Sequence, residues 1–162
     1  MSTWYENKAF EGESMNTLTA CVNGTLKPLN EVNDPVFSQG MLGVGLAITP
    51  SDGRIVAPCD GVVTMVFPTH HAFGIHCDGL DILIHIGIDT VKLNGKHFKA
   101  FIKEGDVVRR HQLCVECDIK AIQAHHLSTD TMMVISDKPK EMNFVLHDDS
   151  RSVSIHDSVI TY

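Results

Sequence analysis

Short runs of β-branched and aromatic residues, bounded by Gly, Asp, Asn and Pro, recur from residue 17 onward, while helical periodicity is scarce. Runs of this length and spacing are typical of an antiparallel β-sandwich or flattened barrel. We therefore predict an all-β fold with few short helical turns. Expected strands cover about 17–22, 25–29, 45–49, 54–57, 61–67, 73–77, 81–88, 113–117, 132–136, 144–147, 152–156 and 158–161.

Turn and helix signals separate these runs. Asn94-Gly95 predicts a β-hairpin turn, and Lys103-Glu104-Gly105-Asp106 predicts a second turn. The segment 118–124 predicts one short helix, because its residues favour a helix and Asp118 is a suitable N-cap.

The chain is long enough for one domain with a full core. It has 162 residues, of which 43% are hydrophobic and 20% are charged. We expect residues 15–162 to form that domain, and residues 1–14, which have no β pattern, to be a flexible tail. Segment 20–26 resembles segment 57–63, because each has the pattern of a tight turn that leads into a strand. The fold is therefore expected to contain a duplicated hairpin motif.

Composition argues against two classes of function. No apolar stretch approaches the roughly 18 residues that span a bilayer, and residues 1–6 lack the basic and apolar regions of a signal peptide. We therefore expect a cytoplasmic protein without membrane insertion, and a monomer by default. The net charge of -7 argues against nucleic acid, which needs a basic face, and is compatible with a partner that carries positive charge.

The five cysteines cannot all pair, and without an export signal we expect reduced thiols. Cys114 and Cys117 have the spacing of a metal knuckle or a redox pair. The segment 113–119 alternates like a strand, however, and residues three apart on a strand face opposite sides. We therefore expect these two thiols to diverge and Cys117 to fill the core.

One histidine stands inside the apolar run 81–91. Alternate isoleucines of this run share one face of a strand, and His85 lies on the other face. Its neighbours there are Leu83 and Gly87, and the small Gly87 is expected to leave space for a bulky group beside the imidazole. His85 is therefore the best candidate for a functional residue.

His70 and His71 are candidates for a partner of His85. They follow a predicted strand that meets Pro68 and turns out of the sheet, and loop residues on a rigid scaffold often carry chemistry. If this strand lies near that of His85, one of the two histidines reaches His85, and the Thr69 hydroxyl is placed to orient His71. From the residues alone, a polar loop that merely contains two histidines is equally expected.

Two facing imidazoles suit two kinds of chemistry. They can bind a metal with further ligands, for which Asp81 or Asp89 is available, although no HExxH or comparable spacing supports this. Alternatively, one ring is a nucleophile and the other donates hydrogen bonds to an incoming anion, which is well matched to phosphoryl transfer. Most other histidines are expected to be solvated surface residues: His97, His111, His125, His126, His147 and His156.

The segment 79–91 resembles the phosphorylation-site pattern of one known family. This is the glucose-type enzyme IIA component of the bacterial phosphoenolpyruvate-dependent sugar phosphotransferase system. The resemblance spans residues 20–136 and implies the antiparallel β-sandwich of that family. Supporting segments are 33–38, 56–61, 67–73 and 104–106.

By this resemblance, His85 accepts the phosphoryl group, His71 is its companion in the site, and Thr69 orients His71. Asp89 flanks the phosphorylated residue. Val44 stands near the site where the family usually has an aspartate. Partner proteins are expected to dock on an apolar collar around the histidines: Phe37, Leu42, Phe67 and Leu83.

The resemblance also implies a reaction and its partners. The chain would be a phosphotransferase component that takes a phosphoryl group from the phosphocarrier HPr and passes it to a cysteine of an enzyme IIB domain of a sugar permease, without cofactor or metal. The alternative is a zinc-dependent hydrolase on a related β scaffold that uses His71 and His85. A lipoyl- or biotin-type carrier needs a modifiable lysine between characteristic neighbours, which Lys92 and Lys96 lack.

Overall fold

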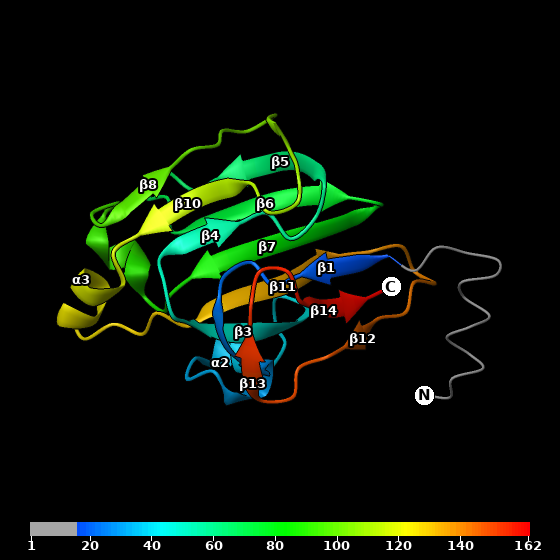
Figure 1. Ribbon diagram of the computed structural model, residues 1–162, viewed down its shortest axis with the longest axis horizontal. Coiled ribbons are helices and arrows are strands. Elements are labelled where there is room, and N and C mark those ends of the chain that lie inside the picture. Colours follow the sequence, from blue (N-terminus) through cyan, green and yellow to red (C-terminus); the bar gives the residue numbers. More distant parts are fainter. Residues whose placement is uncertain (1–15) are drawn as a thin grey trace.

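The structure, a computed structural model, describes residues 16–162, and the tail expected at 1–14 lies outside them. Within the described range the chain forms three antiparallel sheets with short helices between strands (Figure 1). The predicted all-β sandwich is therefore confirmed. The large sheet consists, in spatial order, of β13 (Arg151–Val153), β2 (Gly24–Pro28), β3 (Val44–Pro50), β11 (Thr131–Asp137), β7 (Leu80–Ile86), β6 (Ala72–Cys77), β5 (Gly61–Val66) and β9 (Val107–Val108).

Two small sheets cover one face of the large sheet, which we call the inner face. Their buried side chains join the main apolar cluster, to which Ile82, Ile84 and Ile86 of β7 also contribute. Burial of this cluster removes its apolar side chains from water, which stabilises the fold. One small sheet consists of β4 (Arg54–Val56), β10 (Leu113–Cys117) and β8 (Phe98–Ala100), and the other of β1 (Thr17–Thr19), β14 (Ser158–Thr161) and β12 (Val145–Leu146).

The helices of residues 16–162 are short. Asp118 caps α3 (Ile119–Ala124) by accepting a hydrogen bond from the Ala121 amide at 3.1 Å, which confirms the predicted helix and its N-cap. The strand patterns do not predict α2 (Pro35–Ser38), which Asp34 caps in the same way. Two 3-10 turns complete the set: η1 (Leu29–Glu31) and η2 (Thr90–Leu93).

The two similar sequence segments occupy equivalent places in the large sheet. Segment 20–26 leads into β2, which lies between β13 and β3, and segment 57–63 leads into β5, which lies between β9 and β6. The two segments also begin side by side, because the amide of Thr19, the residue before the first segment, donates to the Pro58 carbonyl at 3.0 Å. This symmetry agrees with a duplicated hairpin motif.

Several expectations about local structure are wrong. Asn94-Gly95 does not close a hairpin: Asn94 is a left-handed residue that ends η2, and β8 pairs with β10 in the other layer. Strand β7 ends at Ile86 instead of continuing to Ile88. The patterns miss β8 and β9, which are three and two residues long.

The turn at 103–106 is confirmed by a hydrogen bond from the Asp106 amide to the Lys103 carbonyl at 3.1 Å.

Candidate functional site

The large sheet positions His85. It lies on β7, where it pairs with Ala72 of β6 and Met132 of β11. Burial alternates along β7, so that the isoleucines are buried on the inner face and His85 is half-buried on the outer face. Met132 and Phe37 belong to a second, smaller apolar cluster on this outer face. His85 is therefore held by paired strands on both sides and surrounded by apolar groups.

His71 reaches His85 from the adjacent hairpin. The turn between β5 and β6 is closed by a hydrogen bond from the Phe67 amide to the Ala72 carbonyl at 2.9 Å, and the His71 carbonyl accepts from the Ile86 amide at 2.7 Å. The centroids of the His71 and His85 rings are 4.9 Å apart, and the ring planes meet at 85°. His71 is 2% exposed, so this ring is the more buried member of the pair.

Each imidazole has one nitrogen fixed by a hydrogen bond. Nδ1 of His85 lies 2.9 Å from the Gly87 carbonyl oxygen, and because a carbonyl can only accept, Nδ1 carries the proton. Nε2 of His85 then has a free lone pair. Nδ1 of His71 lies 2.7 Å from Oγ1 of Thr69, a hydroxyl that can donate or accept. Thr69 is thus placed to orient His71, as the sequence predicts.

Gly87 has a different role from the one expected. It was expected to leave space beside the imidazole, but it is buried beyond the end of β7 with φ at +79°. A Cβ atom there would lie 2.4 Å from Cγ2 of Thr90 and 2.8 Å from the Ser128 carbonyl oxygen. The glycine is needed for the left-handed backbone and this close packing, which turn its carbonyl toward His85.

Two phenylalanines contact the histidines. The Phe37 ring is 5.0 Å from that of His85, and the Phe67 ring is 5.3 Å from that of His71, in an edge-on arrangement. Phe67 is 37% exposed, whereas Phe37 is 4% exposed. Phe37 therefore forms a wall of the site but offers little surface on which a protein could dock.

The other residues that the resemblance places in or beside the collar lie at or near the surface. Leu42 is 38% exposed and Val44 is 47% exposed. Leu83 is half-buried two positions from His85 on the outer face of β7, and Asp89 is exposed at the start of η2.

Burial keeps both rings neutral. It lowers the pKa of His71 to about 4, with a further contribution from the nearby His85. Burial also lowers the pKa of His85, although the Gly87 carbonyl and then the carboxylates of Asp34 and Asp89 act in the opposite direction. At neutral pH the His85 lone pair is consequently available for attack on an electrophile.

Sequence patterns missed two residues that support the site. Asp34, the N-cap of α2, raises the pKa of His85 more than Asp89 does. Thr90 is fully buried and its hydroxyl donates to the Ile86 carbonyl at 2.5 Å, which secures the chain just before Gly87. An N-cap followed by proline is a signal that could have identified Asp34. No local signal marks Thr90, because its partners depend on the folded turn.

The metal alternatives receive no support. Among residues 16–162, no group of three or more His, Cys, Asp or Glu side chains is arranged to hold a metal ion. Cys114 and Cys117 are free and buried in the main apolar cluster, which confirms Cys117 as a core residue.

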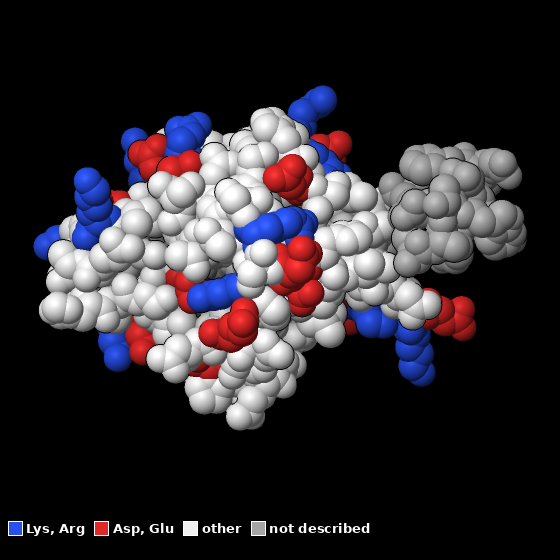
Figure 2. All heavy atoms as spheres, turned by 60° about the horizontal axis from the view of Figure 1, so that its bottom comes forward, with Lys and Arg blue, Asp and Glu red and all other residues white. Residues whose placement is uncertain are grey.

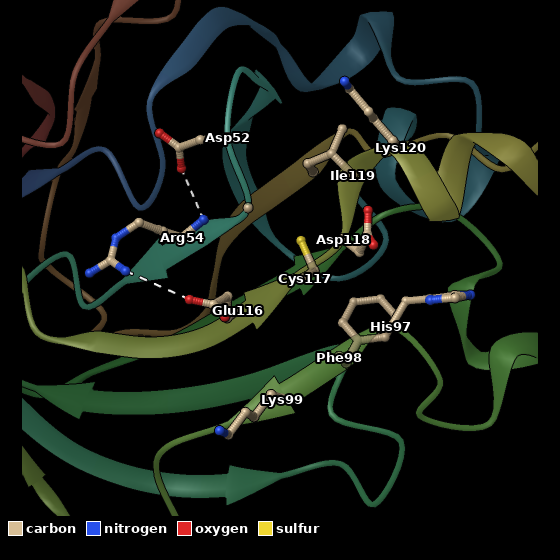
Figure 3. A pocket seen from close by; sticks show the side chains of 11 residues that line it. Asp52, Arg54, His97, Phe98, Lys99, Glu116, Cys117, Asp118, Ile119 and Lys120 are labelled. Carbon is tan, nitrogen blue, oxygen red and sulfur yellow. Dashed lines mark hydrogen bonds and ion pairs between the residues drawn. The ribbon is translucent and has the colours of Figure 1, made fainter.

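One hollow lies apart from His71 and His85, and His97 is among the residues that line it. Its volume is about 640 Å³, and it lies over β4, β8, β10 and the start of α3, the layer that covers the inner face (Figure 3). An ion pair between Arg54 and Glu116 at 3.6 Å crosses it, and Asp52, Lys99 and Lys120 add charges of both signs. These paired and mixed charges do not select one kind of ligand.

The surface carries no sign of a nucleic-acid site on the face drawn in Figure 2. There, basic and acidic side chains are interspersed and do not gather into one basic patch. Within residues 16–162, no helix has the length and apolar character required to cross a membrane.

The fold and the site together define a class: a β-sandwich domain that presents two facing, neutral histidines within an apolar rim. Comparisons with known proteins identify the family within this class. The profile of the family described as "phosphoenolpyruvate-dependent sugar phosphotransferase system, EIIA 1" matches residues 16–141. The chain belongs to this family and is therefore an EIIA-type component of a sugar phosphotransferase system.

Two relatives agree with this assignment. The chain is 50% identical over 115 residues to the PTS system glucose-specific EIICBA component of Staphylococcus saprophyticus, a match that covers 70% of this chain and 17% of that protein. The chain thus spans a small part of this much longer relative. Glucose permease IIA from Mycoplasma capricolum superposes with a TM-score of 0.85 at 31% identity, covering 92% of this chain and 96% of that one.

Proposed function

We propose that this chain is a phosphohistidine carrier that accepts a phosphoryl group on Nε2 of His85. The observation that carries this proposal is the hydrogen bond from Nδ1 of His85 to the Gly87 carbonyl. It fixes the tautomer whose Nε2 lone pair is free, on a ring that burial keeps neutral. Family membership supports the same role.

The donor is HPr phosphorylated on histidine, and the acceptor is a cysteine of an enzyme IIB domain. Nε2 of His85 attacks phosphorus in line, a new N–P bond forms, and the N–P bond to the HPr histidine breaks. The proton stays on Nδ1 of His85, where it is donated to the Gly87 carbonyl, so the ring needs no separate base. In the second step the IIB thiolate attacks the same phosphorus and His85 leaves as neutral imidazole. We expect these steps to occur in the cytoplasm.

His71 stabilises the transferred group. If the Thr69 hydroxyl donates to Nδ1, the proton of His71 is on Nε2, where it can donate to the equatorial phosphoryl oxygens. A neutral ring with a pKa of about 4 supplies this donor without being protonated first. Thr69 acts by fixing this tautomer.

The apolar rim provides the docking surface. Phe67, Leu42 and Leu83 offer exposed or half-exposed apolar area around His85, while Phe37 supports the ring from below and Asp89 lies beside the site. A surface that is largely apolar can serve two unrelated partners in turn and excludes water from a labile phosphohistidine.

The experiment is to mix the full chain with phosphoenolpyruvate, enzyme I and HPr, and to measure acid-labile phosphate on the chain. Wild type should be labelled, and His85→Ala should not. His70→Ala is the matched control, because His70 adjoins His71 in the turn but has no place in the mechanism, and it should be labelled normally. Label that persists in the His85→Ala variant would exclude His85 as the acceptor.

A further inference from the structure

A mostly buried ion pair lies beside the turn that follows β7. Nζ of Lys27, on β2, is 2.5 Å from Oδ2 of Asp130, the residue before β11. The other carboxylate oxygen of Asp130 accepts a hydrogen bond at 2.8 Å from Oγ1 of Thr49, on β3. Asp130 is 9% exposed, and the side chain of Lys27 is 24% exposed. Both carboxylate oxygens are therefore held by side chains of the neighbouring strands.

The register of the large sheet places this ion pair on the same face as the catalytic histidine. Ala47 of β3 pairs with Lys27 on one side and with Met132 on the other. Met132 in turn pairs with His85. Side chains of directly paired residues share a face of the sheet, so these four residues form one row across the outer face. Asp130 lies two positions before Met132 and next to this row.

The backbone just before β11 holds the turn that follows β7. The Gly87 amide donates to the Asp130 carbonyl at 2.9 Å. The Ile88 amide donates to the Ser128 carbonyl at 3.1 Å. This Ile88 amide belongs to the same peptide group as the Gly87 carbonyl, which accepts from Nδ1 of His85. A shift of the backbone at Asp130 would therefore move the acceptor that fixes the tautomer of His85.

The ion pair is better suited to fixing geometry than to adding stability. The cost of removing two charges from water offsets much of their attraction, so a buried pair is weak evidence for stability. Its charge-assisted contacts nevertheless fix the position of the carboxylate. The carboxylates that raise the pKa of His85 are those of Asp34 and Asp89. An effect of Asp130 on His85 is consequently expected to pass through the backbone.

We propose that Asp130 is a positioning residue for His85. Its carboxylate is held by Lys27 and Thr49, and this fixes its backbone carbonyl against the Gly87 amide. The Gly87 carbonyl is thereby kept in line with Nδ1 of His85. The inference concerns the unphosphorylated ring, and it rests on the proposed function only for its effect on the rate of transfer.

The test measures two quantities in variants of the full chain: exchange of the His85 Nδ1 proton with water, by nitrogen-15 NMR, and the rate of transfer from phosphorylated HPr. Asp130→Ala removes both side-chain contacts. It should speed the exchange about fivefold, because the hydrogen bond to the Gly87 carbonyl weakens. It should slow the transfer about tenfold, because the ring is less well oriented.

A conservative variant should preserve the positioning. In Asp130→Asn, the side-chain oxygen can still accept from Lys27 and the NH₂ group can donate to Thr49. Exchange and transfer should therefore both stay within about twofold of wild type, since geometry is kept while the charge is lost.

Ile55→Val is the control for a loss of stability alone. Ile55 is fully buried on β4, in the layer that covers the inner face, and the shorter side chain leaves a small cavity there. The variant should lower the urea midpoint of unfolding and leave exchange and transfer unchanged.

Two results would overturn the proposal. One is a His85 Nδ1 proton that exchanges in Asp130→Ala at the wild-type rate. The other is an equal rise in exchange in Ile55→Val, which would make stability the cause. A wild-type chain that takes up no phosphate would instead contradict the proposed function, and the exchange measurement would still decide the role of Asp130.

Discussion

Two pairs of histidines have similar ring geometry but very different surroundings. The centroids of His71 and His85 are 4.9 Å apart at 85°, and those of His111 and His156 are 4.6 Å apart at 68°. In the first pair each Nδ1 has a hydrogen-bonding partner. In the second, Nε2 of His111 is buried without a hydrogen-bonding partner among the described residues, and His156 is exposed.

The difference teaches that contact between two imidazoles does not make a transfer site. A nucleophilic ring needs a fixed tautomer, a second ring oriented as a donor, and an approach for its substrate. In the pair on the large sheet, the carbonyl of one left-handed glycine fixes the tautomer of His85, and the proposed transfer assigns the other two requirements to His71 and to the apolar rim. The pair formed by His111 and His156 has contact alone. The expectation that His111 is a solvated surface residue is wrong, since this residue is half-buried.

After the loss of labelling in His85→Ala, the largest effect should come from His71→Ala. Loss of the donor that faces the phosphoryl oxygens should slow transfer from HPr by about 10²- to 10³-fold. His111→Ala removes a ring with the same kind of neighbour and should leave the rate unchanged. Rapid-quench measurement of phosphate on the chain gives both rates, and equal rates for the two variants would remove the distinction between the pairs.

Gly87→Ala tests the anchor of His85. The added Cβ would meet Thr90 and the Ser128 carbonyl in a backbone that alanine disfavours, so the variant should lose about 3 kcal/mol in free energy of unfolding. Phosphorylation should slow as the Gly87 carbonyl moves from Nδ1 of His85. Gly105→Ala is the matched control, with φ at +91° and no atom within 4 Å, and should lose only about 1 kcal/mol. Urea unfolding would measure both, and similar losses would argue against the role of packing at Gly87.

Sequence patterns predict the parts of this site that depend on local periodicity. Alternation along β7 predicts that His85 faces away from the isoleucines, and the spacing of Thr69 and His71 predicts their hydrogen bond. The role of Gly87 could not be predicted, because it depends on Ser128, which folding brings from far along the chain. The burial of Phe37 could not be predicted either, because the cluster that buries it is assembled only in the tertiary structure.

The pH dependence of the free energy of unfolding should show the contribution of the buried ring of His71. Its pKa is about 4 in the folded chain and near 6.5 when unfolded, so below 6.5 the unfolded state binds more protons. The stability from this group is therefore complete above pH 6.5 and is lost as pH falls toward 4, by on the order of 2 kcal/mol. Guanidinium unfolding across this range should show the loss in wild type and in His111→Gln, which retains His71. A His71→Gln variant with the same slope would show that another group is responsible.

The smallest effect should come from Thr69→Val, which removes one hydroxyl and keeps the shape of the side chain. Without the hydrogen bond to Nδ1, His71 no longer favours the tautomer with its proton on Nε2, and transfer should slow about fivefold, or about 1 kcal/mol. Thr25→Val on the exposed face of β2 is the control and should transfer at the wild-type rate. Nitrogen-detected NMR of the imidazoles can identify the cause of the slower transfer. The variant should change the tautomer of His71, while His85 keeps its proton on Nδ1. If the rate falls with both tautomers unchanged, Thr69 acts on the phosphoryl group itself and His71 is oriented by packing against Phe67 alone.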